Sequence, residues 1–252
     1  MAEILMYEEL ESTSTTAKEM ARNGIAHGTT IIADRQTAGR GRYNRSFHSP
    51  GQTGIYMSTI LHRNKLGTME QALITIHAAV AVCEAINEVT DKNPQIKWVN
   101  DIFLDSKKIC GILVEAVADA IIVGIGVNFC APRDNFPPDL QQIAGAIFTD
   151  EIPSTTRNHL STEILARLTK IPASQNSRDE LIEKYRQRLF MLGKRVIISR
   201  GGAMPCADQA QAQAQTEATA LDINNMGHLI VQKDSGEILT LNSGEVSIKL
   251  SP

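Results

Sequence analysis

The order of elements in this chain is decided by one stretch, KKICGILVEAVADAIIVGIGVN (residues 107–128). It contains two apolar runs, residues 108–116 and 119–127, which are predicted strands because they are short and rich in β-branched side chains. Only Val117 and Ala118 separate the runs, and so short a connection joins antiparallel strands. The stretch therefore argues against a doubly wound parallel fold, in which strands and helices alternate strictly.

The segments around this hairpin predict an α+β domain with a mixed or antiparallel sheet. Further strands are expected at residues 29–33, 54–61 and 95–98. Helices are expected at residues 16–21, 69–86, 158–170 and 178–192. Capping boxes at Thr16–Glu19 and Thr68–Gln71 mark the expected starts of the first two helices.

The sequence changes character after Gly193. Five short β-like runs follow, at residues 195–199, 218–223, 228–232, 237–241 and 245–250. Gly, Asn and Asp-Ser turns separate them, which is typical of a small β-barrel. We therefore expect a main domain over residues 1–192 and a small β-domain over residues 193–252. The Ala/Gln-rich residues 207–215 are expected to form an exposed turn or a poorly ordered loop.

The charge balance excludes broad binding to polyanions. The 252 residues carry 28 acidic and 25 basic side chains, for a formal net charge of −3. Such a chain has no overall electrostatic attraction to nucleic acid or anionic membranes, so any anion binding must be local. No DNA or membrane partner is therefore expected.

The sequence also predicts a cytoplasmic protein. No run approaches the roughly 18 apolar residues of a membrane span, and the first ten residues have three glutamates and no basic residue, unlike a signal peptide. The four cysteines are scattered, without metal-ligand spacing, which favours a reducing compartment and no bound metal site. They are Cys83, Cys110, Cys130 and Cys206.

Four arginines fall within eleven residues, interleaved with Gly39 and Gly41. They are Arg35, Arg40, Arg42 and Arg45. Arginines so close together repel one another, which suggests an anionic partner such as phosphate or carboxylate. A solvated basic loop or a nucleic-acid patch would have the same composition. The sequence has neither a dinucleotide-binding glycine fingerprint nor a GxxxxGK[ST] phosphate loop.

Two further segments carry polar or glycine signals. Lys108 enters an apolar strand, where it either neutralises a substrate anion or keeps its head in water at the strand edge. Asn100 and Asp101 could hold a magnesium–phosphate group or form a turn. Gly124 and Gly126 either admit a ligand close to the backbone or mark tight sheet packing.

Taken together and in this order, these motifs resemble those of the biotin–protein ligase family. The motifs are EST (11–13), QTAGRGR (36–42), KWVND (97–101), GILVE (111–115, after Lys108) and GIGVN (124–128). The resemblance implies a catalytic domain like that of class II aminoacyl-tRNA synthetases, followed by an SH3-like barrel. It implies that biotin and ATP give biotinyl-5′-adenylate, with Mg²⁺ as cofactor. Biotin would then pass to a lysine of the biotin carboxyl carrier protein of a carboxylase such as acetyl-CoA carboxylase.

The resemblance also implies roles for individual residues. The catalytic residues would be Lys108, Arg42 and Asp101. The role of Asp101 is a hypothesis from the chemistry of the second step, which needs a neutral carrier lysine that Asp101 could orient or deprotonate. Biotin and the adenylate would be bound by Ser12, Thr13, Ser14, Gln36, Gly39, Arg40, Gly41, Arg42, Lys108, Gly111 and Gly124. ATP would be bound by Arg45, Phe47, Asn100 and Asn128. Positive groups suit this chemistry, because a carboxylate attacking an α-phosphate brings two anions together.

The sequence departs from the family pattern in the arginine loop. The family loop continues Arg-Gly-Arg with a tryptophan two residues later, whereas this sequence continues with YNRSF (residues 43–47). Val99 stands where proline is frequent. Asn44 tolerates a left-handed backbone, and Phe47 can still stack on a purine. Only 11 residues precede Ser12, so we expect neither the DNA-binding domain of some relatives nor transcriptional repression.

The sequence leaves two alternatives to a biotin ligase open. A lipoate–protein ligase or related acyltransferase would share the fold and the adenylate chemistry. An RNA-binding module would use the arginine loop without ATP turnover. We expect a monomer or a homodimer.

Overall fold

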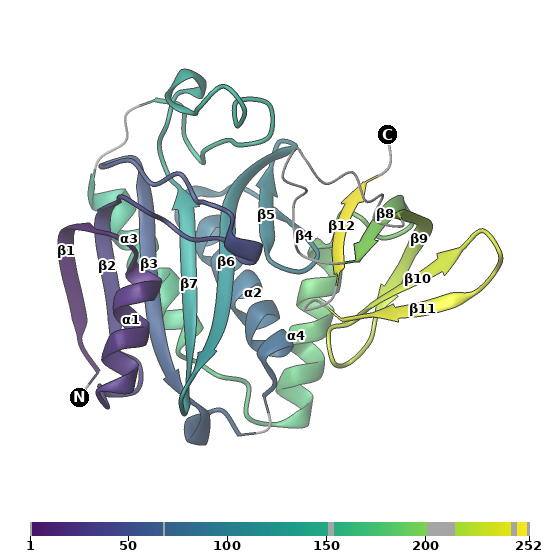
Figure 1. The fold of residues 1–252 in the computed structure, drawn as a ribbon, viewed down its shortest axis with the longest axis horizontal. Coiled ribbons are helices and arrows are strands. Elements are labelled where there is room, and N and C mark those ends of the chain that lie inside the picture. Colours follow the sequence, from purple (N-terminus) through teal and green to yellow (C-terminus); the bar gives the residue numbers. More distant parts are fainter. Residues whose placement is uncertain (1, 68, 151–153, 201–214, 243–245, 251–252) are drawn as a thin grey trace.

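A computed structural model describes residues 2–67, 69–150, 154–200, 215–242 and 246–250, which form two sheets (Figure 1). The larger sheet has seven strands. In sheet order they are β1 (Ile4–Leu10), β2 (Thr30–Gln36), β3 (Gly54–His62), β7 (Ala120–Asn128), β6 (Lys107–Val117), β5 (Asp101–Leu104) and β4 (Gln95–Lys97). β1 and β2 run parallel, and the other neighbouring pairs are antiparallel. The mixed sheet predicted from the sequence is therefore confirmed.

The hairpin of β6 and β7 lies inside this sheet. Val117 pairs with Ala120, so the turn is Ala118 and Asp119, one residue later than predicted. Ala118 has φ +48°, the left-handed backbone that such tight hairpin turns require.

Four helices cover the sheet (Figure 1). They are α1 (Thr13–Arg22), α2 (Gln71–Thr90), α3 (Ser154–Leu168) and α4 (Gln175–Arg188). The sheet has an apolar core on each face. Consecutive side chains of β3 point into different cores, because side chains alternate between the two faces of a strand. Ile60 packs with Ala17 and Ala21 of α1, whereas Leu61 packs in the cluster that contains α2 and α3.

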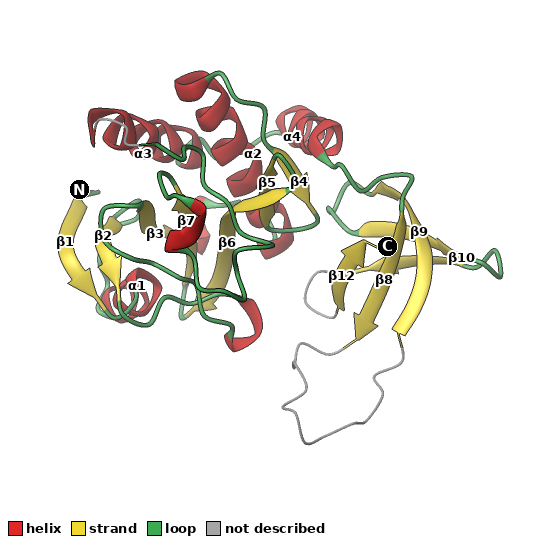
Figure 2. Cartoon of the chain, turned by 90° about the horizontal axis from the view of Figure 1, so that it is seen from above, coloured by secondary structure: helices red, strands yellow, loops and turns green. Residues whose placement is uncertain are grey.

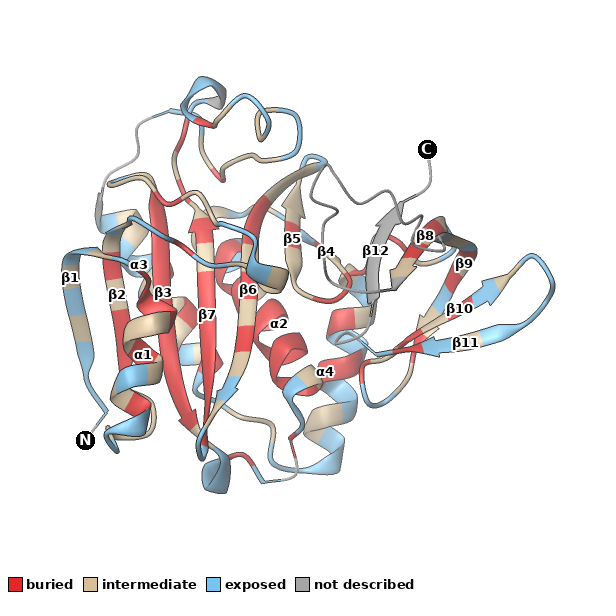
Figure 3. Cartoon of the chain, viewed as in Figure 1, coloured by how far each residue is buried: buried red, intermediate tan, exposed pale blue. Residues whose placement is uncertain are grey.

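Helix α2 is the core helix of the main domain. It is long and apolar enough to cross a membrane by length and composition alone, but 72% of its most apolar window is buried inside the protein. Figure 3 shows this buried helix behind the sheet. Burial within the protein accounts for its apolar composition.

The starts of the first two helices differ from the prediction. α1 begins at Thr13 with Ser12 as N-cap, so the Thr16–Glu19 pair lies inside the helix. α2 begins at Gln71, whose side chain donates to the carbonyl of Val114 in β6 instead of capping the helix. Thr68 lies outside the described residues.

Two strands of the sheet were not predicted. β1 alternates half-buried and exposed side chains at the sheet edge, so it lacks the apolar run of a buried strand. β5 has four residues and follows β4 after a three-residue turn, which is too short for a clear periodic signal.

The small domain is a five-stranded antiparallel sheet that lies beside the main domain (Figure 2). In chain order the strands are β8 (Arg195–Arg200), β9 (Gln215–Ile223), β10 (Leu229–Lys233), β11 (Ile238–Leu241) and β12 (Val246–Leu250). The five predicted strands are therefore present. Gln215 begins β9, and the rest of the predicted Ala/Gln loop lies outside the described residues.

Candidate active site

One cavity, with a volume of about 190 Å³, lies between the start of α1, the arginine loop and the strands β3, β5, β6 and β7. We define the arginine loop as residues 37–53, between β2 and β3. The lining residues are Ser12, Thr13, Ser14, Gln36, Arg40, Gly41, Arg42, Tyr43, Arg45, Ser46, Phe47, Met57, Lys97, Trp98, Asn100, Asp101, Lys108, Gly111, Ile112, Leu113, Gly124, Ile125 and Gly126.

The first turn of α1 presents three buried hydroxyl groups to the cavity, those of Ser12, Thr13 and Ser14. Gln36 Oε1 accepts hydrogen bonds from the backbone N–H of Thr13 at 2.9 Å and from its hydroxyl at 3.1 Å. The hydroxyl of Ser58 on β3 lies 2.8 Å from that of Thr13 and 3.1 Å from that of Ser14. These bonds fix the hydroxyls of Thr13 and Ser14, which together with the Ser12 hydroxyl we call the polar wall of the cavity. The N-terminal end of the α1 dipole lies at this wall.

The two arms of the arginine loop pair with each other. The N–H of Phe47 donates to the carbonyl of Gly39 at 2.8 Å, and Arg40 forms a β-bridge with Ser46. A Cβ on Gly39 would lie 2.4 Å from the Phe47 carbonyl oxygen, so only glycine permits this approach. At the tip, Tyr43 and Asn44 have φ +57° and +58°, and the left-handed backbone predicted for Asn44 extends to Tyr43.

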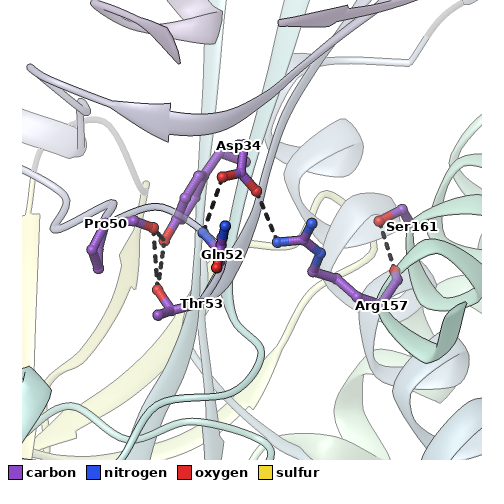
Figure 4. Close-up of polar contacts among 7 residues, drawn as sticks. Asp34, Pro50, Gln52, Thr53, Arg157 and Ser161 are labelled. Carbon is purple, nitrogen blue, oxygen red and sulfur yellow. Dashed lines mark hydrogen bonds and ion pairs between the residues drawn. The ribbon is translucent and has the colours of Figure 1, made fainter. Parts of the chain in front are cut away.

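The base of the loop is fixed to the main domain (Figure 4). Asp34 of β2 accepts a hydrogen bond from the backbone N–H of Gln52 at 3.1 Å. Its other carboxylate oxygen pairs with Arg157 of α3 at 2.9 Å. The hydroxyl of Tyr56 donates to the Pro50 carbonyl at 3.0 Å. The base is therefore held from two sides.

Cationic side chains converge on the cavity, and Lys108 and Arg42 each meet a polar partner there. Lys108 Nζ lies 2.6 Å from Asp101 Oδ1, in a half-exposed ion pair. Arg42 donates to Asn100 Oδ1 at 3.1 Å. Arg35 is different, because it pairs with Glu9 of β1 at 3.0 Å and lines a separate surface hollow. The predicted four-arginine cluster therefore contributes three arginines to the cavity.

Glycines form the floor of the cavity between β6 and β7, where Gly111 pairs with Gly126. A Cβ on Gly126 would lie 2.6 Å from the ring of Phe47, and one on Gly111 would lie 3.3 Å from it. Phe47 therefore rests on this floor and takes up part of the cavity. Its ring also meets Tyr56 edge to face, with the ring centroids 6.4 Å apart.

The cavity brings together all of the predicted site residues except Gly39 and Asn128. Gly39 supports the pairing of the loop arms, and Asn128 donates its side-chain N–H to the Gly145 carbonyl at 2.8 Å. Sequence reasoning assigned no role to Met57 or Trp98, which also line the cavity, and it singled out Gly126 beside Gly124 without counting it among the binding residues. Strand alternation identifies Gly126, which lies two residues from Gly124 on the same face.

The Trp98–Val99 peptide bond, beside the cavity-lining Trp98 side chain, is cis.

None of the described cysteines lines the cavity: Cys83 and Cys110 are buried elsewhere and Cys130 is half-buried. Burial raises the pKa of the Cys83 thiol to about 12, and it also raises the pKa of Cys110. Thiols held in the neutral form are poor nucleophiles. Within the described part of the chain, no cluster of three His, Cys, Asp or Glu side chains could hold a metal ion. Cys206 lies outside the described residues.

Two family models match the chain. Residues 6–128 match the Biotin/lipoate A/B protein ligase family, and residues 211–249 match the Biotin protein ligase C terminal domain. The first match contains every predicted site residue, from Ser12 to Asn128.

Curated relatives are similar to this chain over different lengths. The bifunctional ligase/repressor BirA of Bacillus subtilis is 40% identical over 153 residues, which are 58% of this chain and 47% of that protein. The chain thus spans about half the length of the first curated relatives it matches. The biotin--[acetyl-CoA-carboxylase] ligase of Mycobacterium tuberculosis is 25% identical over 240 residues, which are 92% of this chain and 85% of that one.

Solved structures share the fold over the whole chain. The biotin protein ligase from Aquifex aeolicus, in complex with biotin and ATP, has a TM-score of 0.78 and 25% identity, with 100% of both chains covered.

Proposed function

Because the chain belongs to the biotin/lipoate A/B protein ligase family, we propose that it is an ATP-dependent biotin–protein ligase. It would convert biotin and ATP to biotinyl-5′-adenylate and then transfer biotin to a lysine of a biotin carboxyl carrier protein. The observation that carries this proposal is the meeting of cationic side chains with a glycine floor in one cavity. The names of the relatives and the biotin and ATP bound to the Aquifex protein support it.

In the first step, a carboxylate oxygen of biotin attacks the α-phosphorus of ATP. The new O–P bond forms as the bond to the β-phosphate oxygen breaks, and pyrophosphate leaves. Lys108 and Arg42 offset the repulsion between the two anions, because both cations line the cavity. The glycine floor and the hydroxyls at the start of α1 would receive biotin.

In the second step, the neutral amine of the carrier lysine attacks the carbonyl carbon of the adenylate. A C–N bond forms, the C–O bond to AMP breaks, and the amine loses a proton. We assign the orientation of this amine to Asp101, which Lys108 holds at 2.6 Å. The adenylate hydrolyses in water, so the arginine loop would cover it until the carrier arrives.

The nucleotide would contact Arg45, Phe47 and Asn100 in the cavity. Contact with Asn128 requires its side chain to leave the Gly145 carbonyl. Phe47 must leave the glycine floor to stack on adenine, and Asn100 already accepts a hydrogen bond from Arg42. The oxygens of Asn100 and Asp101 both face cations, so they do not fit a resident metal. We therefore assign Mg²⁺ to the incoming metal–ATP complex.

We place the reaction in the cytoplasm, with a carboxylase carrier domain as partner and the enzyme as a monomer or homodimer. Cys83, Cys110 and Cys130 are free thiols, which suits a reducing compartment.

The decisive test is the labelling of a purified carboxylase carrier domain. Incorporation should require both biotin and ATP and should be lost when the carrier lysine is replaced. Pyrophosphate exchange with biotin and with lipoate separates the two ligase activities, and exchange with lipoate alone would overturn the proposal. Salt-dependent RNA binding without ATP turnover would favour the RNA-binding module instead.

Lys108 and Asp101 should separate the two chemical steps. Lys108→Ala should reduce biotin-dependent pyrophosphate exchange by about 100-fold or more, as expected when a positioned charge at the reacting centre is lost. Asp101→Asn should retain measurable exchange and lose transfer to the carrier. Circular dichroism checks that both variants fold. Wild-type exchange in Lys108→Ala would remove Lys108 from the mechanism.

A further inference from the structure

Glu115 connects three elements beside the cavity. It lies on β6, where strand alternation places it on the same face as Gly111 and Leu113. Its Oε1 atom lies 2.5 Å from Nζ of Lys18 on α1 and 3.3 Å from Nη2 of Arg40 in the arginine loop. The mechanism proposed above assigns no role to Glu115 or Lys18.

The two cations around Glu115 differ in exposure. The side chains of Lys18 and Glu115 are 16% and 22% exposed, whereas that of Arg40 is 38% exposed. The Oε2 atom of Glu115 is buried and has no hydrogen-bond partner among the described residues. A carboxylate in this setting requires nearby positive charge. Lys18 supplies that charge from the body of the domain, so the carboxylate remains compensated when Arg40 moves away.

Arg40 lies in the part of the arginine loop beyond its fixed base. The base of the loop is held through Asp34 and Pro50 (Figure 4). Arg40 stands between Gly39 and Gly41, close to the tip. Its bond to Glu115 joins the tip of the loop to the sheet.

We propose that Glu115, compensated by Lys18, is a positioning residue that anchors the arginine loop over the cavity through Arg40. The anchor favours the closed loop before any ligand arrives, so the substrates bind a pre-ordered site. It also slows escape and hydrolysis of the adenylate. These consequences for turnover rest on the proposed function, whereas the anchoring of the loop does not.

Limited digestion with trypsin tests the anchor without reference to any reaction. Trypsin cleaves after Arg40, Arg42 and Arg45 when the loop opens. Glu115→Gln should be cleaved there about fivefold faster than wild type, the population change expected when one partly exposed charged contact is lost. Glu9→Gln is the matched control, because it breaks the Arg35–Glu9 surface pair away from the cavity. It should be cleaved at the wild-type rate.

Steady-state kinetics then test the consequence for catalysis. Glu115→Gln should raise the KM for biotin about fivefold with kcat nearly unchanged, and it should release more pyrophosphate per biotin transferred. Arg40→Gln should lose the same contact from the exposed side of the pair. The double variant should therefore be no worse than the more impaired single variant.

The proposal would be overturned if trypsin cleaved Glu115→Gln at the wild-type rate. It would also be overturned if the effects of Glu115→Gln and Arg40→Gln on KM multiplied in the double variant. If Glu115→Gln does not fold, Arg40→Gln replaces it in the test, and cleavage of that variant after Arg42 and Arg45 at the wild-type rates overturns the proposal equally. If the wild-type protein does not turn over biotin but Glu115→Gln still speeds cleavage of the loop, the proposed function is wrong and the anchor stands.

Discussion

At the scale of single residues, Gly124 and Gly126 set the depth of the cavity in different ways. A Cβ on Gly124 would lie 2.6 Å from the Ser14 hydroxyl and 3.4 Å from the Leu113 carbonyl oxygen. Ser14 is buried and its hydroxyl bonds to Ser58, so it has little room to move. A Cβ on Gly126 would instead meet the ring of Phe47, the end of a rotatable side chain.

These neighbours predict a contrast between two substitutions. Gly124→Ala should weaken biotin binding at least tenfold and also destabilise the fold by about 1–3 kcal/mol, because overpacking disturbs the buried hydroxyls. Gly126→Ala should weaken biotin binding while the Tm stays close to that of wild type, because Phe47 can turn away. Isothermal titration and thermal unfolding measure the two effects. Equal losses of Tm in both variants would contradict the argument.

Single residues also mark the limit of sequence reasoning at the site. Lys108 and Gly124 could be predicted because a lysine or glycine in an apolar strand is unusual by itself. The partners Lys18 and Glu115 could not, because 97 positions separate them and only the folded sheet brings them together. The resting place of Phe47 on the glycine floor depends on the loop pairing, which no local pattern contains.

At the scale of elements, the contact between α2 and α3 contains a buried histidine. His77 of α2 is 7% exposed, and its Nε2 donates to the carbonyl of Leu168 at the end of α3 at 3.0 Å. Burial lowers the pKa of His77 below its ordinary value of 6.5. His27 also has a lowered pKa through burial, and its Nδ1 accepts a hydrogen bond from the His62 backbone.

Acid should therefore destabilise the main domain. His77 and His27 bind a proton more tightly in the unfolded chain than in the folded one. The stability that comes from keeping them neutral is therefore fully present above about pH 6.5, and it is lost as the pH falls toward their lowered pKa values in the folded protein. Between pH 7.5 and 5.5 the Tm should fall in wild type and fall less in His77→Gln. His159→Gln, at an exposed position of α3, is the control and should keep the wild-type pH dependence. An unchanged pH dependence in His77→Gln would exclude His77 as a source.

Elements could be predicted where their pattern was long or strongly periodic. The helix at α2 and the hairpin of β6 and β7 are of this kind, since buried apolar residues repeat through both. The start of α1 was predicted wrongly, because its first turn belongs to the polar wall of the cavity and is held by Gln36 rather than by a capping box. Tertiary contacts of this kind override a local capping signal.

At the scale of the whole molecule, the small domain docks on the main domain beside the cavity. The indole N–H of Trp98 donates to the Gly227 carbonyl at 3.0 Å, and Trp98 itself lines the cavity. Gly227 has φ +78°, and a Cβ there would lie 2.1 Å from the Cδ1 atom of Ile76 on α2. A second cavity joins the domains, with Arg42 and Asn100 on one side and His228 on the other.

Gly227→Ala should therefore loosen the docking of the small domain. Gly236→Ala is a close control, because Gly236 has φ +87° and its Cβ would meet no atom within 4 Å. Both variants bear the cost of a left-handed alanine, about 1–2 kcal/mol. Only Gly227→Ala also clashes with Ile76, which is fully buried and so has little room to move. Urea unfolding of Gly227→Ala should show a larger loss of stability and two separated transitions, since the domains would no longer unfold together.

The KM for ATP should rise in Gly227→Ala alone, because the small domain forms one wall of the second cavity, next to Arg42 and Asn100. Identical unfolding curves and KM values for the two variants would mean that docking through Gly227 supports neither the fold nor the site.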